Sequence, residues 1–429
     1  MGLAVVCSAC AAPSLRYKTD VNKLLAQDKI EAADQHIQSK QKRMYAKKDV
    51  HLLYLDRATL LHDVNKPKES DFLLAQAQDR INDLYTKSAT AEIGTLVIND
   101  LTTAYDVADY ERAFTFFYRA MNFLQQNDVS GAAVEARKAV FFLDGLRGSK
   151  KKGYTDDPFI QYFASLVFES VGQLSDARIS RQNALNAYNK QGKEMGVQTP
   201  NFPLPSNIND LGEVILFHYN GLLPLKKTQT IQLAWDRAMS IASSPEETRD
   251  QVAPEVQNAL HAGIMGSAIT ISFPQLEAQL YRVYSSAAVI DAQRYPLYKV
   301  ANLSALAKQD FNEKMPSVWF RTVTRALVKR IAAVQAHKAA AEASKDEGVG
   351  VLAEMFVGML GSALEKADTR QWFTLPAEIH MTRIFVAPGK RDIHLLLRDK
   401  NGNIIGEKVF EGVIVPRGGR VFLHHRSAY

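Results

Sequence analysis

The pattern of apolar and polar positions divides the chain into regions of different character. Residues 17–193 are dominated by Ala, Leu, Gln and Lys, which favour helix, and contain proline only at Pro67 and Pro158. This pattern predicts an almost wholly helical domain over 17–193, with both prolines at turns. Asp157, directly before Pro158, is expected to cap a helix that has proline at its first position.

A repeat runs through this helical domain. Small, large, small and small residues stand at offsets 0, +3, +12 and +19 in three places. The sets are Ala58, Leu61, Ser70 and Ala77; Ala120, Phe123, Ala132 and Ala139; and Ser165, Phe168, Ala177 and Ala184. This spacing is typical of a tetratricopeptide helix pair, in which small residues let the helices pack closely.

The repeat predicts a tetratricopeptide-like solenoid of helical hairpins, with a concave face that binds protein or peptide. The turns are expected at Asn65-Lys66, Asn127-Asp128 and Gly172-Gln173, and a partial earlier pair at 21–43. The alternative is a generic helical bundle in which the matches arise by chance.

Residues 194–345 form a mixed β/α region in this interpretation. A proline-rich linker at 200–205 precedes short stretches that are typical of strands. We predict strands at 213–219, 228–233, 268–273, 281–289 and 296–300. An amphipathic helix is predicted at 304–343, because Trp319, Val323, Leu327, Ile331 and Val334 form one apolar face.

The remaining sequence predicts two further units. Residues 346–367 contain an apolar stretch punctuated by Gly350, Gly358 and Gly361, which is too short to span a bilayer. We interpret it as a buried helix packed through its glycines, with a helix on the membrane surface as the alternative. Residues 368–429 predict a small antiparallel β-sandwich-like module with strands at 379–386, 392–398, 404–410 and 420–424. The fold class is therefore α+β, mainly α.

Composition narrows the class of function. The 429 residues are 46% hydrophobic and 23% charged, which is typical of a globular protein, with a formal net charge of +6. Basic residues are mixed with acidic ones, and the densest basic run, 40–48, contains only Tyr45 as an aromatic. This pattern argues against a nucleic-acid partner.

Cysteine occurs only at Cys7 and Cys10. Cys10 follows Ser8-Ala9 and a short apolar stretch, as the acylated cysteine of a bacterial lipoprotein signal does. The stretch is short, Cys7 stands where such signals carry Leu, Val or Ile, and no basic residue precedes it. We interpret residues 1–16 as a lipoprotein signal and tether with Cys10 lipidated; Ala11 favours the periplasm-facing side of the outer membrane. The alternative is an ordinary apolar N-terminus.

Three stretches, 110–124 with 133–138, 212–221 and 367–378, resemble a family of bacterial tetratricopeptide-like outer-membrane lipoproteins. The resemblance covers most of the chain. It implies an envelope location but no particular activity, and the irregular lipobox departs from the pattern.

Sequence motifs for catalysis are not found. The chain has no P-loop, dinucleotide fingerprint, H-E-x-x-H or G-x-S-x-G, so we predict no enzymatic activity and no cofactor. Four histidines lie in residues 368–429 and could together bind a metal ion: His380, His394, His424 and His425. His380 shares a strand face with Glu378 and Thr382 and is expected to be solvated, so we predict no metal site there.

Charged residues of the helical domain are the candidates for partner binding. Polar side chains often line a tetratricopeptide groove, and the candidates are Arg112, Arg119, Glu135 and Arg137. The alternative is a set of helix-surface ion pairs worth roughly 0.3–0.5 kcal/mol each. The aromatics of the same helices are expected in the core between hairpins: Phe116, Phe117, Tyr118, Phe141 and Phe142.

Together these observations predict a non-catalytic, lipid-anchored envelope scaffold that binds proteins or peptide segments, as an accessory to an assembly or export system. The alternative is a protein that binds or processes cell-wall or exported polysaccharide.

Overall fold

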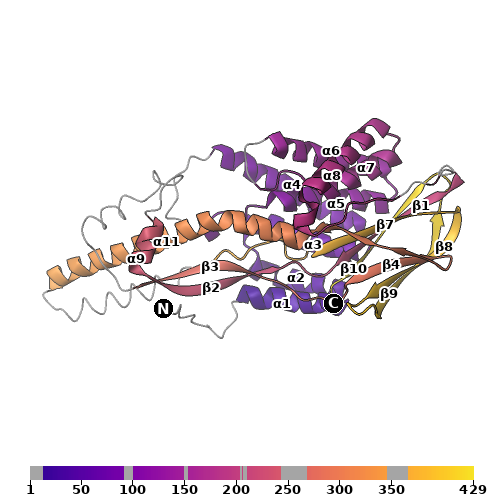
Figure 1. Cartoon of the computed structure of the whole chain (residues 1–429). Coiled ribbons are helices and arrows are strands. Elements are labelled where there is room, and N and C mark those ends of the chain that lie inside the picture. The colour runs from indigo at the N-terminus through magenta and orange to yellow at the C-terminus, as the bar shows by residue number, and fades with distance from the viewer. Residues whose placement is uncertain are drawn as a thin grey trace.

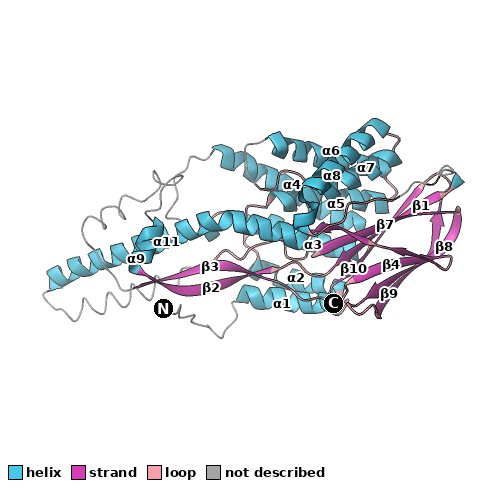
Figure 2. Ribbon diagram, viewed as in Figure 1, coloured by secondary structure: helices cyan, strands magenta, loops and turns pink. Residues whose placement is uncertain are grey.

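The computed structural model describes residues 13–90, 100–148, 153–202, 205, 210–242, 268–344 and 366–429 (Figures 1 and 2). Over these residues the fold is α+β and about 53% helical, which confirms the predicted class and the helical N-terminal region. Cys10 and the apolar stretch at 349–364 lie outside the described residues. None of the described helices is long and apolar enough to cross a membrane.

Eight helices follow one another as four hairpins, which we call the helical array. The hairpins are α1 (Pro13–Ala26) with α2 (Ile30–Met44), α3 (Val50–Asp63) with α4 (Pro67–Thr90), α5 (Asp109–Gln125) with α6 (Val129–Gly148), and α7 (Pro158–Ser170) with α8 (Leu174–Met195). Short 3-10 turns η1 (Lys47–Asp49) and η2 (Asp100–Thr102) lie between hairpins. Asp157 caps α7 as predicted, accepting a hydrogen bond from the Ile160 amide at 2.9 Å.

The four hairpin turns have the same backbone geometry. In each, one residue has a positive φ of 57° to 72°: Asp28, Asn65, Asn127 and Gly172. The next amide donates at 2.9 Å to the carbonyl five residues earlier, in the pairs Lys29–Leu24, Lys66–Leu61, Asp128–Phe123 and Gln173–Phe168. This is the Schellman pattern that ends a helix, and it confirms the three predicted turns.

The small residues of the repeat lie where the helices meet. All nine are at most 3% exposed. Ser70 also donates from Oγ to the carbonyl of Ala58 at 2.8 Å, which joins the first and third positions of one repeat. The small side chains therefore allow close helix packing, as the spacing predicts.

Two four-stranded sheets lie beside the array. The central sheet has the order β10 (Arg420–Ser427), β1 (Gly212–Asn220), β7 (Glu378–Val386), β6 (Tyr298–Asn302), and the outer sheet has the order β5 (Gln293–Pro296), β4 (Ser285–Ile290), β8 (Gly389–Arg398), β9 (Ile404–Val415). β1 and β10 are parallel, whereas the other pairs are antiparallel. Each sheet joins strands from both 194–345 and 368–429, so these two predicted units share their sheets.

The central sheet is covered on both faces. On β1, Phe217 and Tyr219 belong to the apolar core shared with the array, while Val214 and Leu216 belong to the core shared with the outer sheet. His380 on β7 is therefore buried, with Nε2 3.0 Å from Glu378 Oε2. The prediction that His380 is solvated is wrong, because alternation along a strand indicates a solvated face only where that face is uncovered.

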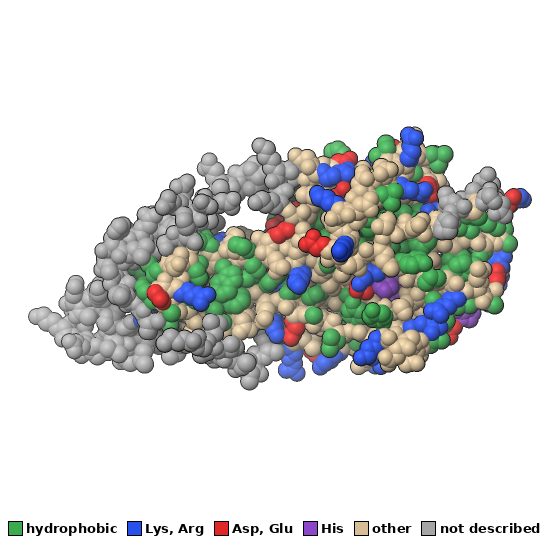
Figure 3. All heavy atoms as spheres, in the orientation of Figure 1, with side chains coloured by type: hydrophobic (Ala, Val, Ile, Leu, Met, Phe, Trp, Pro, Cys, Tyr) green, Lys and Arg blue, Asp and Glu red, His purple; other side chains and the backbone are tan. Residues whose placement is uncertain are grey.

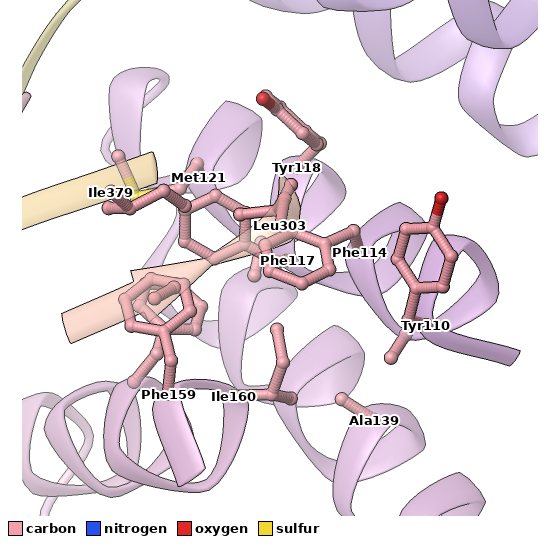
Figure 4. Packing of buried hydrophobic residues seen from close by; sticks show 14 of the residues in the cluster. Tyr110, Phe114, Phe117, Tyr118, Met121, Ala139, Phe159, Ile160, Leu303 and Ile379 are labelled. Atoms are coloured by element: carbon pink, nitrogen blue, oxygen red, sulfur yellow. The ribbon is translucent and has the colours of Figure 1, made fainter. Parts of the chain in front are cut away.

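Aromatic rings fill the space between the array and the central sheet. The Phe117 ring lies 4.8 Å from that of Phe163 and 5.1 Å from that of Phe159, centroid to centroid. Figure 4 shows Phe117 gathered with its neighbours from several elements. Phe117 and Tyr118 are buried as predicted, but Phe141 is 80% exposed, so its assignment to the core is wrong.

A two-stranded sheet and two helices form an arm that extends away from the array (Figure 1). The arm consists of β2 (Leu225–Ala234), α9 (Trp235–Ala242), β3 (Ala268–Glu277) and α11 (Leu303–Ser344), which continues through Pro316. Side chains of all four elements make a separate small core, to which Val323, Leu327 and Ile331 contribute from the predicted apolar face of α11.

Candidate functional site

The side of the array that faces the central sheet, its inner face, holds a segment of the same chain. Residues 368–374, which we call the clamped segment, lead into β7. The Trp372 indole donates to Thr59 Oγ1 at 2.8 Å, and the Trp372 amide donates to Glu111 Oε1 at 3.1 Å. The Phe373 amide donates to Asp56 Oδ1 at 3.1 Å. Side chains of α3 and α5 thus bind the backbone of an irregular segment that ends in a turn at Phe373-Thr374.

Charges at the start of the clamped segment strengthen its attachment. Arg370 donates from Nη1 to Asp49 Oδ1 at 2.8 Å and from Nη2 to Asp368 Oδ2 at 2.6 Å. Lys18 of α1 donates to the Thr369 carbonyl at 2.5 Å. The segment is therefore bound by side chains from α1, η1, α3 and α5.

Burial shifts the pKa values of the groups that bind this segment. Burial raises the pKa of Asp56 to about 7, although Tyr45, Lys18 and Thr374 all oppose the shift. Burial likewise lowers the pKa of Lys18 to about 8, against the attraction of Asp56. Burial also raises the pKa of Glu111, which accepts hydrogen bonds from Tyr105 and from the Ala108 and Trp372 amides. Burial thus disfavours the charged forms of these groups, and hydrogen bonds to neighbouring residues offset part of that cost.

The predicted partner-binding residues do not line this inner face together. Arg119 contacts Asp71 at 2.7 Å and Glu135 at 3.0 Å, with side chains 13% exposed for Arg119 and 2% for Glu135. Arg119 also donates to Gln78 Oε1 at 2.8 Å. These interactions join α4, α5 and α6 to one another.

Arg112 and Arg137 lie apart from that ion pair. The Arg112 guanidinium lies 4.8 Å from the ring centroids of both Tyr85 and Phe142. Arg137 is half-exposed, donates to Gln173 Oε1 at 2.7 Å and lies 3.7 Å from Asp176 Oδ2 of α8. The structure thus brings Arg119 and Glu135 together and places only Arg137 openly on the surface.

The second helices of the hairpins expose apolar residues at equivalent positions. Phe72, Val134 and Ile179 each lie two residues after a buried small residue of the repeat, and they are 64%, 49% and 56% exposed. We call these three residues the outer row. Phe141 and Leu174 are exposed on the same helices, α6 and α8. The outer row was not predicted, although the offset of +14 in the repeat carries the signal.

A cavity of about 470 Å³ lies where the arm meets the array. It is bounded by the loop 103–106, by β2, β3 and α11, and by residues 366–370. Three acidic residues and six basic ones line it: Asp106, Asp310 and Asp368, and Lys226, Lys314, Arg321, Arg325, Lys366 and Arg370. The lining carries an excess of positive charge and is suited to an anionic ligand.

Comparison of the chain with protein families, with curated proteins and with solved structures finds no match.

Proposed function

We propose that the protein is a non-catalytic, lipid-anchored scaffold of the bacterial envelope that binds another protein through the outer face of a tetratricopeptide-like solenoid. The outer row is the observation that carries this proposal. The inner face already binds the clamped segment and the central sheet, so a partner has access to the second helices instead. In this proposal Cys10 carries the lipid that holds the protein at the outer membrane.

Repetition distinguishes the outer row from scattered surface residues. Single exposed apolar residues are common on proteins and need no explanation. Here the same repeat position is apolar and exposed in three successive hairpins. Because equivalent positions of a repeat array recur along one surface, the three side chains are offered to a partner from the same side of three successive hairpins. Burying each half-exposed side chain would contribute roughly 1 kcal/mol.

Of the predicted partner-binding residues, Arg137 keeps this role in the proposal. It lies on α6 three residues after Val134 and four before Phe141, and such residues share a helix face. Arg119 and Glu135 are assigned a structural role, because their ion pair is largely buried between helices, whereas the Arg137–Asp176 pair is half-exposed. Arg112 is assigned to packing against Tyr85 and Phe142.

Photocrosslinking in intact envelopes tests the proposal. A crosslinking amino acid in place of Phe72, Val134 or Ile179 is expected to give the same partner band from each position. A variant with all three residues changed to Glu should lose that partner and keep the melting transition of the wild type, because surface substitutions alter stability little.

A matched control replaces exposed apolar residues elsewhere. Leu280, Tyr284 and Ile414 are at least as exposed as the outer row, and changing all three to Glu should leave the partner bound. Retention of the partner by the outer-row variant, or its equal loss in the control, would contradict the proposal.

The cavity at the base of the arm supports a second candidate function, the binding of an anionic cell-wall or exported polysaccharide. Its basic lining and its volume of about 470 Å³ fit an acidic sugar unit. Over the face shown in Figure 3, by contrast, basic and acidic side chains are interspersed. Calorimetric binding of an acidic oligosaccharide that Lys226→Glu abolishes would favour this function over the scaffold.

A further inference from the structure

The two strands of the arm, β2 and β3, which we call the ribbon, have unpaired edges. They pair antiparallel over ten residues each and with no other described strand. The Leu225 end of β2 lies at the base of the arm and the Ala234 end at its tip. Of the backbone amides in these strands, only that of Lys226 donates to a described group outside the pair, Gln371 Oε1 at 2.6 Å. Both outer edges therefore offer backbone N–H and C=O groups to an added strand.

One face of the ribbon is covered and the other is polar. Ile231, Leu233, Ile269 and Ile271 are buried against α9 and α11. The residues between them face the other way and carry no charge, and Thr230 Oγ1 lies 2.9 Å from Ser272 Oγ. Those of this face that are exposed are Thr228, Gln232, Ala234, Ala268 and Thr270. The two helices thus cover a face of the ribbon and add no strand to either edge.

The half of the ribbon nearer the tip has no protection against a further strand. Strand edges in solvent usually carry lysine, proline or a bulge, which prevent pairing with another chain. Here the lysines, Lys226 and Lys227, and the one proline, Pro274, all lie towards the base. Residues 228–234 and 268–273 contain no charge, no proline and no bulge. Such uncharged, strand-forming segments pair readily with other strands.

The charges at the base differ between the two edges and indicate which strands meet. β2 carries Lys226 and Lys227 and no acidic residue, whereas β3 carries Glu277 and no basic residue. Lys227 Nζ donates to Glu277 Oε1 at 3.0 Å, and the Glu277 side chain is still 47% exposed. A second ammonium group can therefore reach this carboxylate from the outer side. A pairing of β2 with β2, or of β3 with β3, would bring no opposite charges together.

We propose that the ribbon is an interface between copies of this chain, in which the β2 edge of one copy pairs antiparallel with the β3 edge of the next. Main-chain hydrogen bonds supply the affinity, as in other cases of strand addition. With the register found inside the chain, Lys227 contacts Glu277 of the next copy, and Thr230 lies across from Ser272 of the next copy. The contact is head-to-tail, so repetition closes a ring or extends a filament according to the rotation between copies.

Thiol crosslinking of the full chain tests this pairing. In a background with Cys7 and Cys10 changed to Ser, Thr230→Cys and Ser272→Cys chains are co-expressed with tags of different size. A short bismaleimide should join the two variants to each other and neither variant to itself, because only unlike edges meet. As a control, Tyr284→Cys, exposed outside the ribbon, should give no product with either. Self-crosslinking of Thr230→Cys alone would indicate a two-fold β2–β2 contact and overturn the head-to-tail arrangement.

A pair of charge variants in the same background provides an independent test. Gln232 and Thr270 are exposed partners across the ribbon. Gln232→Lys with Thr270→Lys places like charges across every contact between copies and should reduce the mass in light scattering to that of one chain. Gln232→Lys with Thr270→Glu alternates the charges and should keep the assembly.

Both charge variants should keep the melting transition of the background chain, because the substituted residues lie on the surface. Two results would each overturn the proposal. One is a background chain that has the mass of a single copy at every concentration, which would mean that something other than a second copy covers the edges. The other is a variant with both lysines that assembles as well as the variant with opposite charges.

Discussion

The two faces of the helical array share one repeat but differ in what covers them. The inner face is covered by the central sheet and the clamped segment, and its aromatic and polar side chains are buried. The outer face presents Phe72, Val134 and Ile179 to solvent. The repeat sets how the helices pack, but strands from elsewhere in the chain decide which face remains available. Substitutions that separate the two faces test this comparison.

The inner face is expected to give the largest effect. Trp372→Ala should destabilise the fold by about 3–5 kcal/mol, because it removes a fully buried indole and leaves a cavity. It also removes the donor that Trp372 Nε1 provides to Thr59. Urea unfolding followed by circular dichroism measures the change. A change below about 1 kcal/mol would mean that the clamped segment is bound weakly enough to exchange with a partner.

Two arginines of the array sharpen the comparison. Arg119→Glu should cost about 3 kcal/mol, because it leaves Glu135 and Asp71 beside a third carboxylate. Arg137→Glu, on the outer face, should change the unfolding free energy by no more than about 0.5 kcal/mol. The same urea titration compares the two. Equal effects would contradict the division of these residues into structural and surface groups.

A smaller effect is expected within one turn of α8. Ala177→Leu should destabilise by roughly 1–3 kcal/mol, because the added methylenes enter a close helix contact. Ile179→Leu, two residues along on the outer row, should be neutral within about 0.5 kcal/mol. Thermal melts of the two variants measure the difference. If Ala177→Leu left the melting temperature unchanged, the result would contradict the placement of Ala177 in a close helix contact.

The sequence predicts those features that depend on nearby residues. The hairpin turns follow from Asn or Gly at the end of a helix, and the close packing follows from small residues at fixed spacing. Most strands are predicted in the same way, from short apolar stretches between turn residues. The prediction misses β5 and starts β4 four residues too early, at 281 instead of Ser285. Such signals lie within one helix pair or one strand.

Features that depend on distant residues were not predictable in the same way. The interpretation of His380 failed because an outer sheet covers its strand. The interpretation of Phe141 failed because an apolar residue at helical spacing can also face solvent. The charge of Arg119 and Glu135 makes them candidates for partner binding, but their pairing depends on how α4 packs against α5 and α6. The hydrogen bond between His424 and the His62 carbonyl depends on a contact across 362 positions.

The parallel pairing of β1 with β10 has a consequence for the order of folding. β1 lies between β7 and β10, so both of its neighbours come from residues 378–427. During synthesis from the N-terminus, the hairpins emerge long before the strands that cover their inner face. Until those strands are synthesised, the aromatic side chains of the inner face remain exposed to solvent. Exposed apolar surfaces of this kind promote aggregation. We expect nascent chains that end before residue 420 to need a chaperone to remain soluble. The complete chain is expected to bury these side chains without one.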